Sequence, residues 1–80
     1  MASPPRAPAP PPEDPRRAAT RARVIDEATR LFSLYGFRRT SVYTIASAAA
    51  VAKPTLYTYF PDKDALFLAV CEHVLESILA

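Results

Sequence analysis

Residues 49–60 read AAVAKPTLYTYF and decide how the rest of the chain is divided. A proline stands inside a stretch that otherwise looks helical. Proline is tolerated in the first turn of a helix, because its missing N–H has no intrahelical partner there. Pro54 therefore predicts the start of a helix. Leu56 and Phe60, four residues apart, form its inner side, and Pro61 ends it.

A second short helix is predicted just upstream, over residues 42–49. Its apolar residues recur at helical spacing, and they are Val42, Ile45, Ala46 and Ala49. Thr40 and Ser41 are both candidates for its N-cap, since hydroxyl side chains accept hydrogen bonds from free N–H groups at a helix start. About three residues then separate the two short helices.

Two longer amphipathic helices flank this pair. The first is predicted from about Arg17 to Tyr35, with Gly36 supplying the left-handed residue that ends it and Phe37 making the following apolar contact. The last is predicted to be capped by Asp62 and to continue to the chain end. Its expected apolar band is Leu66, Phe67, Val70, Cys71, Val74, Leu75 and Ile78.

The first fifteen residues, MASPPRAPAPPPEDP, hold seven of the nine prolines. Because proline cannot continue a helix, residues 1–16 are predicted to be a disordered or polyproline-II arm. Residues 17–80 form the predicted folded unit. Arg6, Arg16 and Arg17 could reach from such an arm into a DNA minor groove, as basic arms do elsewhere.

Charge is unevenly distributed along the chain. The net charge is only +2, but residues 16–63 hold nine Lys and Arg against three acidic residues, while residues 64–80 carry acids alone. This asymmetry favours a polyanion-facing surface, with a solubilising distribution as the alternative. The single cysteine excludes an internal disulfide and fits a reducing, cytoplasmic setting.

An all-α bundle of three helices and a fourth connecting helix is thus predicted, with a helix-turn-helix in its centre. In that plan the second short helix enters the major groove of DNA N-terminus first. Lys53, Thr55 and Tyr57 can contact phosphates, and lysine and threonine can also reach base edges. Taken singly, such a lysine is more often a surface charge, such a tyrosine a packing residue, and Thr55 could simply start the helix. The order of the elements is what makes the pattern specific.

The sequence resembles the N-terminal DNA-binding domain of TetR-family transcriptional regulators. The resemblance covers about residues 21–74 and is carried by VIDEATRLFSLYGFRRTSVYTIA at 24–46 and VAKPTLYTYFPDKDALFLAV at 51–70. It implies a DNA-binding regulator, here expected to be a repressor. It also implies a homodimer on a palindromic operator, with a ligand-sensing and dimerisation domain beyond the fourth helix. That domain is absent from these 80 residues.

The resemblance also implies which residues meet DNA. Ser41 or Thr40 would bind a phosphate, and Tyr43 would contact a base or the backbone. Lys53, Pro54 and Thr55 would lie at the groove floor, with Tyr57 on a phosphate and Tyr59 at the groove edge. Lys63 would meet the backbone. Two departures from the family pattern stand out: Ala50 replaces a usual glycine in the turn, and Ala52 replaces a usual serine cap.

Other classes of function are less well supported. His73 and Cys71 lie two residues apart on one helix and so on different faces, and no metal-ligand cluster, phosphate loop or paired carboxylate site is evident. No enzyme activity and no cofactor are therefore expected. The alternatives that remain are a truncated, non-functional fragment and a small helical module that binds another protein through its apolar last helix.

Overall fold

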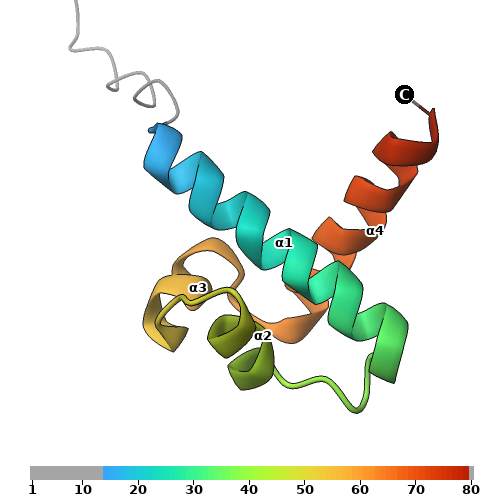
Figure 1. The fold of residues 1–80 in the computed structure, drawn as a ribbon, viewed down its shortest axis with the longest axis horizontal. Helices are drawn as coiled ribbons and strands as arrows, with labels where there is room; N and C mark the ends of the chain where they lie inside the picture. The colour runs from blue at the N-terminus through green and yellow to red at the C-terminus, as the bar shows by residue number, and fades with distance from the viewer. Residues whose placement is uncertain (1–13, 80) are drawn as a thin grey trace, which may run out of the picture.

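The computed structural model describes residues 14–79, and within that range every regular element is a helix. The helices are α1 (Pro15–Tyr35), α2 (Val42–Ala48), α3 (Lys53–Tyr59) and α4 (Lys63–Leu79). Figure 1 shows α1 as a long rod with α2 and α3 on one side and α4 crossing it. The predicted all-α fold is confirmed.

The beginning of α1 lies two residues earlier than predicted. Asp14 is its N-cap and accepts a hydrogen bond of 3.0 Å from the Arg16 N–H, and Pro15 occupies the first helical position. A proline there costs nothing, because its N–H would be unpaired in any case. Residue 16, assigned to the proline-rich arm, is therefore helical, and residues 1–13 of that arm lie outside the described range.

The other helix boundaries agree closely with the prediction. Gly36 ends α1 with a φ of 87°, but its ψ of 163° is extended, so the residue is not in the left-handed helical conformation. Pro54 lies in the first turn of α3. Asp62 accepts a hydrogen bond of 2.7 Å from the Ala65 N–H at the start of α4.

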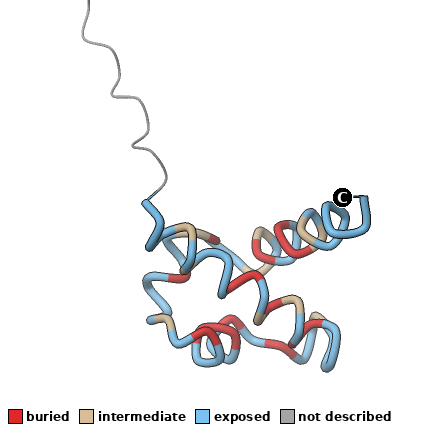
Figure 2. Tube along the Cα trace, turned by 45° about the horizontal axis from the view of Figure 1, so that its top comes forward, coloured by how far each residue is buried: buried red, intermediate tan, exposed pale blue. Residues whose placement is uncertain are grey.

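One contiguous core joins the four helices. Helix α1 supplies five of its residues, and Figure 2 shows the buried positions concentrated where the helices meet. The core consists of Val24, Ile25, Ala28, Leu31, Phe32, Val42, Ile45, Ala46, Ala49, Leu56, Phe60, Leu66, Ala69 and Val70. The small residues Ala46 and Ala49 are among its buried members.

Only the first half of α4 contributes side chains to this core. Only Leu66, Ala69 and Val70 are buried, whereas Val74, Leu75 and Ile78 are exposed. Figure 1 shows the reason: α4 diverges from α1 after their crossing, so the apolar residues of its second half lie away from the buried core. Of the expected apolar band, only Leu66 and Val70 are therefore buried in this core.

Aromatic rings close the end of the bundle where α1 leads into α2. Phe32, Phe37 and Phe67 pack together with ring centroids 5.0–5.6 Å apart, in stacked and edge-to-face arrangements. Phe37 thus makes the apolar contact expected after Gly36. This cluster holds the loop before α2 against the start of α4.

Candidate nucleic-acid interface

Helices α2 and α3 form a helix-turn-helix whose turn is residues 49–52. Ala50 has a φ of 56°, a left-handed backbone conformation that costs steric strain for every residue except glycine. Ala52 is the N-cap of α3 and provides no side-chain hydrogen bond. Ala50 therefore has the positive φ that favours glycine, and Ala52 leaves α3 without a side-chain cap.

Ser41, rather than Thr40, caps α2. The Thr44 N–H donates to Ser41 Oγ at 3.0 Å, and the two hydroxyl oxygens lie 2.9 Å apart. Ser41 is exposed, so its side chain and the first turn of α2 remain open to a partner. Both hydroxyl side chains are chemically able to cap a helix, and in this fold Ser41 is the one that caps α2.

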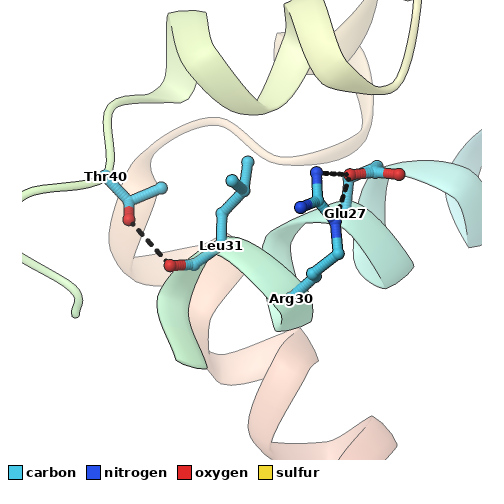
Figure 3. A network of polar contacts seen from close by, with 4 residues as sticks. All are labelled: Glu27, Arg30, Leu31 and Thr40. Atoms are coloured by element: carbon cyan, nitrogen blue, oxygen red, sulfur yellow. Dashed lines mark hydrogen bonds and ion pairs between the residues drawn. The ribbon is translucent and has the colours of Figure 1, made fainter. Parts of the chain in front are cut away.

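Thr40 points into the protein. Its side chain is 2% exposed, and its hydroxyl lies 2.8 Å from the Gly36 carbonyl oxygen and 3.2 Å from that of Leu31 (Figure 3). A hydroxyl that donates to these carbonyls at a buried site cannot also reach a phosphate. The assignment of the Thr40 side chain to the DNA-binding set is therefore corrected: it connects α1 to the loop before α2.

The start of α3 is an exposed polar surface. Lys53, Pro54, Thr55 and Tyr57 are all exposed, while Leu56 and Phe60 are buried and fix the helix on the core. The Lys53 ammonium lies 5.9 Å from the centroid of the Tyr57 ring, within the range of a cation–π contact. This contact holds the lysine along one side of the helix.

The two tyrosines of α3 have different surroundings. Tyr57 is exposed, whereas Tyr59 is half-buried and packs against the core, with its ring centroid 6.4 Å from that of Phe60. Tyr59 therefore has a packing role in the fold. Any contact it makes with a partner involves only the exposed part of the side chain.

Tyr43 and Lys63 lie on α2 and α4, the helices that precede and follow α3. Tyr43 is 69% exposed on the outer face of α2. Lys63, in the first turn of α4, is half-buried, and its ammonium lies 4.2 Å from the centroid of the Phe37 ring. The aromatic cluster thus supports the lysine close to the loop that leads into α2.

Three residues that the sequence analysis did not single out, Ser47, Val51 and Thr58, lie beside the predicted site residues. A depression of about 240 Å³ lies between α2 and α3 and is lined by Tyr43, Ala46, Ser47, Val51, Ala52 and Lys53. Ser47 and Val51 are the new members, and Ser47 could have been found from its place four residues after Tyr43. Thr58, exposed and four residues after Pro54, donates from its hydroxyl to the Pro54 carbonyl at 3.1 Å.

Other kinds of site are not apparent in residues 14–79. No group of three or more His, Cys, Asp or Glu side chains there could hold a metal ion. None of the four helices is both long enough and apolar enough to cross a membrane. His73 of α4 faces Asp26 of α1, with 3.6 Å between Nε2 and Oδ1, and Cys71 is half-buried.

Comparison with known proteins gives a consistent result. The family model described as bacterial regulatory proteins, tetR family, matches residues 24–70. The chain is 38% identical over 63 residues to the HTH-type transcriptional regulator RutR of Escherichia coli, covering 79% of this chain and 30% of RutR. It is 33% identical to the HTH-type transcriptional repressor Rv1474c of Mycobacterium tuberculosis, covering 79% of this chain and 34% of that protein.

A third relative is the HTH-type transcriptional regulator AcrR of Shigella flexneri, 43% identical over 66% of this chain and 25% of AcrR. The chain thus spans about a third or less of the length of these relatives. No solved structure gives a significant match. The matched residues include both helices of the helix-turn-helix, and the chain belongs to the tetR family of bacterial regulatory proteins.

Proposed function

We propose that residues 17–80 are the DNA-binding unit of a transcriptional regulator and that α3 reads base sequence in the major groove. The observation that carries this proposal is the division of α3 into two sides. Leu56 is fully buried and anchors the helix, while Lys53, Pro54 and Thr55 at its N-terminus are exposed. A recognition helix needs this arrangement, because its first residues must reach base edges.

Each exposed residue has a chemical role in this proposal. Lys53 donates to a phosphate or to a guanine edge, and the Thr55 hydroxyl and methyl groups can contact phosphate and thymine. Pro54 offers an apolar surface to a thymine methyl group. The Tyr57 hydroxyl donates to a phosphate, and Tyr59 lies at the edge of the groove.

Phosphate contacts on either side of the groove would fix the register of α3. Ser41 at the start of α2 and Lys63 at the start of α4 are the proposed contacts, with Tyr43 on a base or on the backbone. Such contacts supply most of the affinity without reading sequence. The Phe37 ring beneath Lys63 restricts that side chain before DNA arrives.

Repression is the regulatory outcome that we propose. One relative of the chain is named a transcriptional repressor, and others are named transcriptional regulators. A protein that occupies an operator can exclude the transcription machinery without any enzymatic step. A homodimer on a palindromic operator, formed through a separate ligand-sensing domain, and a cytoplasmic location complete the proposal.

A binding selection tests this function. The 80-residue chain is incubated with sheared bacterial genomic DNA near physiological salt, and the retained fragments are sequenced. We expect enrichment of fragments that share a short motif, and paired inverted motifs if two chains bind together. Salt-sensitive retention with no shared sequence would contradict sequence reading and leave only affinity for the backbone.

A second candidate function is a module that binds another protein through α4. The exposed side chains of Leu68, Leu75 and Ile78 favour it. The two proposals differ in their dependence on α3. Replacement of Lys53 by alanine and of Tyr57 by phenylalanine should weaken DNA binding in the first case and leave all binding unchanged in the second.

A further inference from the structure

Most of the cations in residues 14–79 have no acidic partner within that range. Of the nine Lys and Arg side chains in this range, only Arg30 forms an ion pair, with Glu27 at 2.7 Å (Figure 3). Three others lie over aromatic rings, namely Arg21, Lys53 and Lys63. Four of the unpaired arginines, Arg16, Arg17, Arg21 and Arg23, lie in the N-terminal part of α1.

Two of these arginines continue the buried stripe of α1. The stripe includes Val24, Ala28 and Leu31, spaced by four and three residues. Arg21 and Arg17 precede Val24 at three and then four further residues, so the same face of the helix carries them. They therefore extend the core-facing side of α1 beyond the level at which the core ends.

The contact made by Arg21 shows which helix lies next to this face of α1. Its guanidinium carbon lies 5.3 Å from the centroid of the Phe60 ring, and Phe60 is the C-cap of α3. The N-terminal part of α1 therefore runs beside the end of the proposed recognition helix, and Figure 1 shows α1 projecting past α3 there. Arg17 lies one turn further out, about 6 Å along the helix axis.

The stability of the fold does not explain Arg17. The side chain is exposed, and residues 15–23 contribute no buried side chain to the core. A cation in the first turn is also unfavourable beside the positive end of the helix dipole. An external anion is the partner that this charge suits.

We propose that Arg17 binds a phosphate of the DNA backbone that flanks the groove entered by α3. Arg21, one turn closer to the core, stays over the Phe60 ring. This inference rests on the proposed function. The guanidinium group suits the task, because it stays charged and can donate two parallel hydrogen bonds to a phosphate. The contact is made from a rigid helix rather than from the flexible arm predicted for Arg16 and Arg17.

Arg16 provides a matched control. It is adjacent in sequence, exposed and equally charged, but it lies about 100° around the helix from Arg17. Replacing either arginine with alanine removes the same charge. Neither change removes a buried contact, so circular dichroism should show unchanged helix content in both variants.

The test is the salt dependence of binding to a duplex recovered from the genomic selection. The slope of log K against log salt is negative, and loss of one phosphate contact should reduce its magnitude by about 0.9. We expect this decrease for Arg17→Ala and little change for Arg16→Ala. Arg17→Lys should retain most of the slope with weaker binding, because it keeps the charge and loses the paired donors.

Two results would overturn the inference while leaving the proposed function intact. One is a wild-type slope in Arg17→Ala, and the other is an equal decrease in both alanine variants, which would mean that only net charge matters. If the wild-type chain retains no duplex even at low salt, the proposed function fails and this inference fails with it.

Discussion

The hydroxyl oxygen of Thr40 lies 2.8 Å from the carbonyl oxygen of Gly36, so the residue before the α2 cap is tied to the residue that ends α1. The neighbouring Ser41 hydroxyl is exposed and caps α2. Two adjacent hydroxyl residues thus have separate roles. Thr40 fixes the position of the helix-turn-helix, and Ser41 remains available to a phosphate.

Thr40→Val should destabilise the protein. Valine has nearly the same shape but leaves the Gly36 carbonyl, which lies beyond the end of α1, without its hydroxyl donor, at a cost of about 1–3 kcal/mol. Urea denaturation measures the free energy of unfolding. Thr40→Ser keeps the hydroxyl group and should lose less, so equal losses in the two variants would argue against this role.

Ala50→Gly should stabilise the protein by about 1 kcal/mol, because glycine adopts a positive φ without steric strain. In a domain of this size, such a gain raises Tm by about 4–8 °C. Ala48→Gly is the control, since Ala48 lies within α2 and glycine is unfavourable in a helix. An equal decrease in Tm for both variants would contradict the strain at Ala50.

The caps of the two short helices should respond in opposite directions. Ala52→Ser offers α3 the side-chain acceptor that it lacks and should add about 1 kcal/mol to the free energy of unfolding. Ser41→Ala removes the acceptor of the Thr44 N–H and should subtract a similar amount. Chemical denaturation of both variants checks the pair, and a gain from Ser41→Ala would refute its capping role.

Tyr57→Phe should weaken binding to every duplex by about fivefold, the equivalent of one hydrogen bond of about 1 kcal/mol. The ring remains, so Lys53 keeps its aromatic neighbour. Sequence preference should not change, because the lost partner is a phosphate. Tyr35→Phe removes an exposed phenol at the end of α1 and should bind as the wild type does. Fluorescence anisotropy measures the affinity of both variants for a duplex recovered from the genomic selection and for a scrambled duplex.

The sequence was sufficient to predict the helices because its boundary residues act locally. Gly36, Pro54 and Asp62 each restrict or cap the backbone at their own position, and each marks a boundary in the structure. The positive φ at Ala50 was also predictable, from the glycine expected there. The early start of α1 was missed because Pro15 follows a run of prolines that suggested an arm.

Features that depend on distant contacts were not predictable in this way. Thr40 and Ser41 are equivalent as caps by chemistry, and only the path of the loop from α1 buries the first. The exposed half of α4 repeats apolar residues at helical spacing just as its buried half does. The angle at which α4 leaves α1 decides which half joins the core, and local sequence does not contain that angle.

The most direct test of the central claim, that α3 reads base sequence, is the ratio of affinities for a recovered duplex and a scrambled duplex of the same composition. Lys53→Ala should reduce this ratio by about tenfold or more, since a lost base contact costs about 1–3 kcal/mol. Arg30→Ala removes the same charge from an ion pair on α1 and should leave the ratio unchanged. A wild-type ratio in Lys53→Ala would contradict the account, because the N-terminus of α3 would then not distinguish one sequence from another.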